Sequence, residues 1–324
     1  MFRFRSGKRP EASSKRRSRS SISVMGRFLG GLVLVLAATG ASAGLLDLLR
    51  KPSIELKTGL LDLSLEELVL NTSILGLIEL EIDVNQVIAV LTLPGGIETD
   101  LIINFDRVIG LNEDSLGLSA SELDPEDPAL LQRLPAGAMI IPQADFPMLI
   151  EIEPVDNFAF ANDVELEIHT HNLEFTPGTR LRLFAAAHGE AFRDITTYVG
   201  PGSYRSRGRR GKFSEFLVVE DNRDTDTVIA TKFDYLRDLL EGYRGDIPPY
   251  IYWVLRTEIN SAKNAWNFDD DDRATDLLDS AIETVNRNRG LIPNVWHPNL
   301  DMKNVAGEFT AAAQTLIFSL DLPD

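Results

Sequence analysis

The chain has 324 residues and no cysteine, and its 32 lysines and arginines face 49 aspartates and glutamates, for a formal net charge of −17. So acidic a composition excludes a nucleic-acid binder, because contact with phosphates needs a basic surface. The lack of cysteine excludes thiol catalysis, disulfide bonds and cysteine-based metal sites, and a hydrophobic content of 44% excludes a wholly disordered chain.

The first 43 residues have the three parts of a signal peptide. Residues 1–27 hold nine basic residues and one acid, residues 28–38 form an apolar run of 11, and small residues lead up to Ala43. The run is too short to span a membrane, which takes about 20 residues, and small residues before the cleavage site are typical of signal peptides. We expect export by the general secretory route to the periplasm, the cell surface or the medium. Met25, shortly before Arg27, is an alternative start that gives a signal peptide of ordinary length.

Removal of residues 1–43 would leave a strongly acidic mature chain. Taking away nine basic residues and one acidic residue leaves 23 and 48, which gives a net charge of −25 on 281 residues. A field of this sign repels nucleic acids and anionic lipids and attracts divalent cations. We therefore expect an envelope or extracellular partner, no nucleic-acid partner, and no integral membrane segment in the mature form.

Residues 44–135 predict an N-terminal antiparallel β region and a connector. Apolar and polar residues alternate over Ile78–Val84, and strand patterns continue over 87–93 and 101–109. The turn Pro94–Gly96 separates two of these strands. Residues 119–135 contain three prolines and indicate the connector.

Residues 136–226 predict an immunoglobulin-like β-sandwich. About seven short strands follow one another between residues 147 and 219, divided by Pro–Gly and His–Gly turns, and this spacing is typical of such sandwiches. Residues 216–219 are all apolar, which predicts a central strand covered on both faces.

Residues 227–324 predict a bundle of three to four helices. Apolar residues recur every three or four positions in four segments, so that each helix has one face that must pack against another element. Asn304 is placed to cap the last helix. The predicted fold class is thus α+β, and we expect the helical part to fold separately from the β part.

The helical part resembles the FIVAR/FIMAH-type modules found at the ends of secreted and cell-surface bacterial proteins. The resemblance covers Ile247 to Leu320, under a third of the chain, and the insert Ile292–Trp296 departs from it. The features that carry it are a helix ending in Ala262–Trp266, an acidic break at Asp269–Asp272, a helix over Ala281–Gly290, and an alanine-rich last helix over Ala311–Leu316. It implies a binding or structural role and supplies no catalytic residue.

Three stretches of the β part, Phe192–Thr196, Gly202–Tyr204 and Gly211–Val219, resemble an uncharacterised family of exported proteobacterial proteins, a domain of unknown function. This second resemblance also implies a surface or periplasmic module and no catalytic residue.

His169 and His171 are the first candidate metal ligands. Residues two apart on a strand point the same way, so both histidines share one row with Glu165 and Glu167. Two imidazoles at this spacing can bind Zn²⁺ with a carboxylate as third ligand. The alternative is an ordinary exposed strand face.

Residues 220–226 are the second candidate, for Ca²⁺. The ligands would be Asp221, Asn222, Asp224 and Asp226, which lie where the strands end and the helices begin. Several oxygen ligands are what Ca²⁺ requires, and such an ion would stiffen the junction. The alternative is a solvated acidic linker whose last residues cap the following helix.

A basic island interrupts the acidic chain at Arg205, Arg207, Arg209, Arg210 and Lys212. Gly208 and Gly211 predict that these residues form a loop between two strands. The loop has two interpretations: it is a solvated hairpin tip, or it binds an anionic partner.

The motifs of hydrolases, zinc proteases and nucleotide-binding proteins are absent from the sequence, and His188 and His297 are isolated. We therefore expect a non-enzymatic structural or binding module of the cell envelope, with no cofactor other than the calcium considered above. The alternative is a hydrolase that cuts an envelope polymer through two carboxylates in different environments.

The signal-peptide interpretation predicts that the exported protein begins at or near Gly44. N-terminal sequencing of the released form checks this expectation. A released protein that retained residues 28–43 would contradict export by cleavage.

Overall fold

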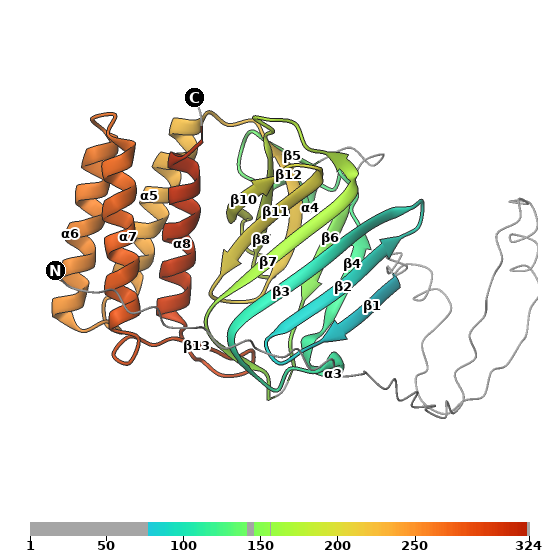
Figure 1. The fold of residues 1–324 in the computed structure, drawn as a ribbon, viewed down its shortest axis with the longest axis horizontal. Coiled ribbons are helices and arrows are strands. Elements are labelled where there is room, and N and C mark those ends of the chain that lie inside the picture. The colour runs from blue at the N-terminus through green and yellow to red at the C-terminus, as the bar shows by residue number, and fades with distance from the viewer. Residues whose placement is uncertain (1–76, 141–145, 156, 323–324) are drawn as a thin grey trace, which may run out of the picture. The chain divides into compact units, whose positions relative to one another are not determined.

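The computed structural model describes residues 77–140, 146–155 and 157–322. The expected signal peptide, residues 1–43, lies outside these residues, as does the start of the expected N-terminal β region, residues 44–76. Two antiparallel sheets packed face to face precede four long helices, so the α+β class and the order of its parts are confirmed (Figure 1).

The first sheet takes strands from both β segments expected from the sequence. Its order is β1-β2-β3-β7-β11-β10, and β13 pairs with the start of β7. Strand β3, which precedes residue 135, runs antiparallel to β7, which follows it, with Leu101 opposite Ile168. Residues 44–135 and 136–226 therefore contribute to one sandwich. The strands are β1 (Leu77–Ile82), β2 (Gln86–Leu93), β3 (Ile97–Ile109), β7 (Ala159–Glu174), β10 (Thr196–Gly200), β11 (Ser203–Arg210) and β13 (Val295–Trp296).

The second sheet has the order β4-β6-β12-β8-β9, and β5 pairs with β12. Phe216 and Val218 of β12 face the core between the sheets, whereas Leu217 and Val219 face a second apolar cluster that includes Leu130. The prediction of a central strand covered on both faces is confirmed. The strands are β4 (Leu118–Glu122), β5 (Ala138–Ile140), β6 (Met148–Ile152), β8 (Leu181–Ala186), β9 (Arg193–Asp194) and β12 (Glu215–Asp221), with the short helices α3 (Glu113–Leu116) and α4 (Pro128–Leu131) beside them.

Five aromatic rings fill one end of the sandwich core. The rings belong to Phe105, Phe158, Phe160, Phe213 and Trp296, and their centroids lie 5.3 to 6.4 Å apart in contacting pairs, mostly edge to face or tilted. Each such pair adds about 0.5–1.5 kcal/mol beyond the burial of its area. Trp296 lies on β13, so the helical part of the chain supplies one ring of the sandwich core.

The four long helices pack around a core of their own. Each presents an apolar stripe at helical spacing, as Ala274, Leu278, Ala281 and Val285 do in α7, so the predicted bundle is confirmed. No helix in the described part of the chain is long and apolar enough to cross a membrane. The helices are α5 (Thr225–Gly242), α6 (Pro249–Trp266), α7 (Asp271–Arg287) and α8 (Val305–Leu320).

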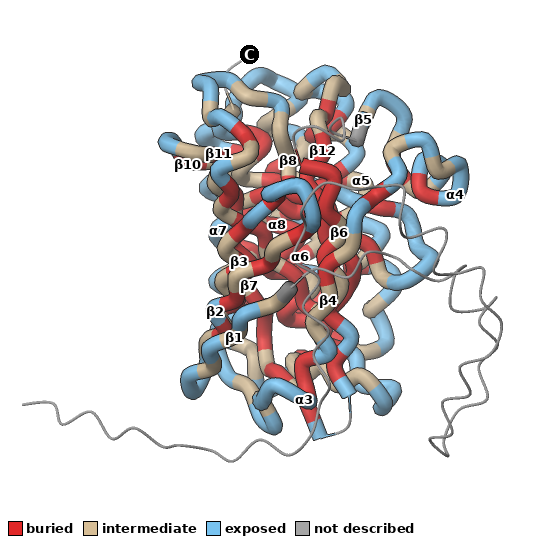
Figure 2. The backbone as a smooth tube through the Cα atoms, turned by 90° about the vertical axis from the view of Figure 1, so that its right-hand side faces the viewer, coloured by how far each residue is buried: buried red, intermediate tan, exposed pale blue. Residues whose placement is uncertain are grey.

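Helix α8 lies between the bundle and the sandwich. It packs against α5 and α7 on one side and against β7, β10 and β11 on the other. Most of its residues are buried, among them Thr310, Thr315 and Ser319 (Figure 2). A helix buried on all sides must belong to the core of a larger unit, and the sandwich and the helices form one compact unit. We call the contact of α5 and α8 with these strands and with β9 the seam.

The N-terminus of α8 is held by one asparagine. Asn304 caps the helix, as predicted, by accepting a hydrogen bond from the N–H of Gly307 at 3.1 Å. Its Nδ2 donates to the carbonyl oxygen of Asn162, near the start of β7, at 2.5 Å and to that of Gly211, just after β11, at 2.7 Å. A Cβ at Gly307 would collide with the carbonyl of Asn162, and a Cβ at Gly211 would collide with the backbone of Glu308. Glycine is therefore required at both positions for the helix to approach so closely.

A buried ion pair joins the two parts at the other end of the seam. Lys232 of α5 places its Nζ 2.6 Å from Oδ2 of Asp194 on β9, and both side chains are at most 8% exposed. Nζ also donates to the carbonyl oxygen of Thr315 at 2.9 Å and to Oγ of Ser319 at 2.8 Å. Burial by itself would raise the pKa of Asp194, but the Lys232 ammonium and the hydrogen bonds from Lys232 and Thr196 outweigh it and lower this pKa. Asp194 is therefore ionised in the folded protein.

The seam revises the expectation that the helices fold alone. In a fragment of residues 226–324, α8 would expose the face that contacts the sandwich, and Lys232 would lose Asp194. We expect far-UV circular dichroism of this fragment to show a broad melt at a lower temperature than that of the full chain. A sharp melt of the fragment at the full chain's temperature would contradict this.

Removal of one partner of the ion pair should destabilise the protein strongly. Lys232→Met leaves a buried carboxylate without its counter-ion, at a cost of roughly 3–5 kcal/mol. Adding Asp194→Asn should restore much of this loss, because the second charge is then gone too. Urea denaturation measures the free energy of unfolding of both variants. Lys263→Met is the control, because the side chains of Lys263 and its partner Asp234 are 32% and 50% exposed. This control variant should lose less than about 1 kcal/mol of stability.

The pH dependence provides an independent check on the same pair. Since the folded pKa of Asp194 lies below its ordinary value of 3.8, its stabilisation is complete above that value and disappears as the pH falls through the lower folded value. In Asp194→Asn the free energy of unfolding should fall less steeply as the pH is lowered through the acid range. An unchanged pH dependence would contradict the stabilising role of ionised Asp194.

Candidate functional site

The basic island is a strand, which corrects the expectation of a loop. Residues 203–210 form β11, because alternate arginines pair with acids on the neighbouring strand β7. Arg205 and Arg207 place Nε 3.2 and 2.5 Å from the carboxylate of Glu167. Arg209 reaches Asp163 at 2.7 Å and Glu165 at 2.5 Å. Three of the five basic residues are thus neutralised across two strands.

These ion pairs also use the acids that the zinc hypothesis required. Glu165 and Glu167 bind arginines, and both ring nitrogens of His169 have partners: Nδ1 lies 3.2 Å from Oδ2 of Asp100 and Nε2 lies 2.7 Å from Oγ of Ser203. The His169 and His171 rings are neighbours, with centroids 5.0 Å apart. The structure brings the two histidines together, and within the described residues it adds no third ligand to them.

The four proposed calcium ligands have separate roles. The buried carboxylate of Asp221 accepts two hydrogen bonds from Arg223, at 2.8 and 2.6 Å. The side-chain oxygen of Asn222 accepts from Arg180 at 3.3 Å. Asp224 caps α5 through Thr227, whose hydrogen bonds lower the pKa of Asp224, and Asp226 follows in the first helical turn. These residues do not come together as a ligand group in the described structure, and the alternative of a linker that caps a helix describes their contacts.

A different group could hold a metal ion. Ligand atoms of Glu151, Glu153 and His188 lie within 4.8 Å of one another. Burial, and then the charges of Glu215 and Glu153, raise the pKa of Glu151. His188 and Glu153 are largely exposed. The sequence does not indicate this group, because its residues are far apart in the chain. Strand β12 pairs with both β6 and β8, and this pairing brings the end of β6 close to the turn after β8.

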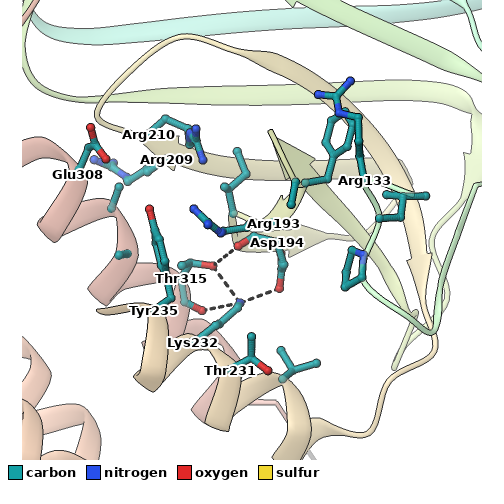
Figure 3. A pocket seen from close by; sticks show the side chains of 18 of the residues that line it. Arg133, Arg193, Asp194, Arg209, Arg210, Thr231, Lys232, Tyr235, Glu308 and Thr315 are labelled. Carbon is teal, nitrogen blue, oxygen red and sulfur yellow. Dashed lines mark hydrogen bonds and ion pairs between the residues drawn. The ribbon is translucent and has the colours of Figure 1, made fainter. Parts of the chain in front are cut away.

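The seam encloses a cavity of about 250 Å³ (Figure 3). Its apolar wall comes from Phe192, Ile195, Val228, Ala311 and Ala312, which lie on or beside β9, α5 and α8. A second cavity of about 440 Å³ shares Asp194, Arg223 and Val228 with it and has a more polar lining. The first is the better candidate for a ligand, because ligand sites are mostly apolar with a few converging polar groups.

Positive charge predominates in the lining of this seam cavity. Six cationic side chains line it, Arg133, Arg193, Arg209, Arg210, Arg223 and Lys232, against two acids, Asp194 and Glu308. Figure 3 shows Lys232 on one side, joined to Asp194 and Thr315. Arg133 pairs with Glu215, and Arg223 with Asp221. Four of the six cations therefore have acid partners, counting Arg209.

The two remaining cations, Arg193 and Arg210, have no ion pair within the described residues. Arg193 stacks its guanidinium over the ring of Tyr235, 4.3 Å from the ring centroid. Arg210 is only 8% exposed and donates from Nη2 to Oγ of Ser214 at 3.1 Å. Burial lowers its pKa, and the charge of Arg193 lowers it further.

From the sequence, Arg210 was expected in a loop, as part of either a solvated hairpin tip or a grip on an anionic partner, and neither Arg193 nor Lys232 was singled out. One signal was available for Lys232, which stands between Ile229 and Phe233 in the apolar stripe of α5. A lysine inside an apolar stripe needs a buried partner. Nothing in the sequence indicates that this partner is Asp194, because the contact joins a helix to a strand of the other part.

Comparison with known proteins completes the description. No curated protein matches the chain. The model of a family of unknown function, DUF6689, matches residues 72–322, which include both sheets, the seam and all four long helices. The chain therefore belongs to the family of unknown function DUF6689.

Proposed function

We propose that the protein is an exported binding module of the cell envelope, without catalytic activity, that takes a small and largely apolar ligand into the seam cavity. The observation that carries this proposal is the cavity itself, which has apolar walls and a few polar side chains that converge on it. Its volume of about 250 Å³ suits a molecule of one or two rings.

The contacts in the seam support binding over catalysis. The acids of the cavity are engaged, Asp194 by Lys232 and Glu308 by the hydroxyl of Tyr243 at 3.2 Å. The Thr315 hydroxyl donates to the carbonyl oxygen of Thr196 at 3.0 Å. Among the described residues that line the cavity, none is a nucleophile paired with a free base, which a hydrolytic site would need.

Two sequence features support the location. Residues 1–43 have the composition of a signal peptide, and the resemblance of residues 247–320 to FIVAR/FIMAH-type modules fits a secreted or surface protein. Export would place the cavity where small molecules of the envelope or the medium have access to it.

The alternative, a hydrolase of an envelope polymer, rests on Glu151 and Glu215. They face each other across β6 and β12. Their environments differ, since the pKa of Glu151 is raised while Glu215 binds Arg133, and such a difference is typical of acid–base pairs. Neither residue lines the seam cavity or the second cavity beside it. If the parent chain cleaves peptidoglycan and the Glu151→Gln variant does not, this alternative is favoured.

Closing the mouth of the cavity should abolish ligand binding. Thr231 is exposed on α5, lines the cavity, and donates its hydroxyl to the carbonyl oxygen of Thr227 at 2.7 Å. Thr231→Trp should lower the affinity for the uncharged two-ring fluorophore 6-propionyl-2-(dimethylamino)naphthalene by roughly tenfold or more, since the indole takes the ligand's place. Fluorescence titration measures it.

Thr257→Trp is the matched control, because Thr257 is also exposed on a helix and donates to the carbonyl oxygen four residues before, at 2.8 Å. It should bind like the parent chain. Equal binding by both tryptophan variants, or none by the parent, would overturn the proposed function.

A further inference from the structure

Arg210 differs from the other three arginines of β11, because it has no ion pair with any described residue. Side chains of β11 alternate, so Arg205, Arg207 and Arg209 share one face and pair with acids of β7. Arg210 points the other way, is almost fully buried, and makes no ion pair with any described residue. Buried charges in proteins are normally paired, because removing an ion from water is costly. Arg210 is therefore a buried cation that no described side chain neutralises.

The hydrogen bonds of Arg210 lead to the same conclusion. A guanidinium carries five N–H donors, and the described contacts use one of them, from Nη2 to Ser214. Its Nε is buried without any partner. Glu308 and Glu190 act on Arg210 through their charge and form no ion pair with it among the described contacts. Arg210 lines the seam cavity, so its remaining donors belong to a side chain of the cavity wall.

A second unpaired cation lies beside the first. Arg193 also lines the cavity, has no ion pair in the described structure, and repels Arg210 electrostatically. Figure 3 shows both arginines reaching into the region between the strands and the helices α5 and α8. Arg193 is exposed to solvent and stacks on Tyr235, so it needs no counter-ion of its own. Because it lines the same cavity, it can add a second guanidinium to an anion that Arg210 binds.

We infer that the ligand of the seam cavity carries an acidic group, a carboxylate or a phosphate, which Arg210 binds with Arg193 at its side. This inference rests on the proposed function and names its ligand class. The planar fork of an arginine matches the two oxygens of such a group, while the apolar wall of Phe192, Ile195, Val228, Ala311 and Ala312 accommodates the rest of the molecule. The site is thus built for an amphiphilic anion with a compact apolar body.

Isothermal titration calorimetry with three probes tests the inference. The probes are 1-naphthylacetate, the uncharged 2-(1-naphthyl)ethanol of similar shape, and inorganic phosphate. The parent chain should bind the carboxylate roughly tenfold or more tightly than the alcohol, as expected for a charge-assisted hydrogen bond. Arg210→Gln should remove this preference by weakening binding of the carboxylate much more than binding of the alcohol. Phosphate binding that Arg210→Gln abolishes would support a phosphorylated ligand over a carboxylate.

Arg205→Gln is the matched control, since it removes an arginine of the same strand that is paired on the opposite face. It should keep the preference for the carboxylate. Arg210→Lys keeps the charge without the fork and should give an intermediate preference. Equal binding of carboxylate and alcohol by the parent chain would overturn the inference and leave the proposed function intact. Failure of the uncharged fluorophore to bind would overturn the proposed function itself.

Thermal melting separates ligand binding from a structural role. If Arg210 serves the ligand, Arg210→Gln should melt at or above the parent's temperature without ligand, because an unpaired buried charge has been removed. Saturating 1-naphthylacetate should then raise the melting temperature of the parent and not that of the variant. A large fall in the variant's melting temperature without ligand would assign Arg210 to the core and overturn the inference.

Discussion

Lys232 stands in the apolar face of a helix, and its ammonium has to be neutralised where water does not reach. Asp194 provides the counter-charge from β9, and Thr315 and Ser319 of α8 provide further oxygens. One side chain thereby determines the relative placement of two helices and a strand. Lys232 and Asp194 also line the seam cavity, so the ion pair forms part of the cavity wall.

The seam joins the core of the helices and the core of the sandwich into one folded unit. Helix α8 is buried by both the bundle and the strands, and Trp296, between α7 and α8, completes the aromatic cluster of the sandwich. Asn304 ties the start of α8 to the carbonyl groups of two strand segments. A family match that runs without a break from residue 72 to 322 agrees with a unit whose parts depend on one another.

Local patterns predicted the elements well, because alternation and helical stripes record which face of an element is buried. Residues 78–84, 216–219 and the stripe of α7 are examples, and Asn304 was recognisable as a cap. The same patterns do not show which other element packs against the buried face. The arginines of 205–210 suggested a loop because glycines flank them, yet the acids of β7 make the segment a strand. The cavity was unpredictable for the same reason, since Asp194, Arg210 and Lys232 meet only in the folded chain.

The pairing of β13 with β7 has a consequence for the order of folding. Val295 lies opposite Ala161, and Trp296 opposite Phe160, with three long helices between the two strands in the chain. Contacts between residues so distant in sequence form late, because a long loop must close before they stabilise anything. The first sheet and its aromatic cluster therefore reach their final form only after residue 296 has been made. Until then the rings of Phe160 and Phe213 lack the indole that covers them, so a nascent or partly threaded chain carries an incomplete sandwich with an exposed apolar end.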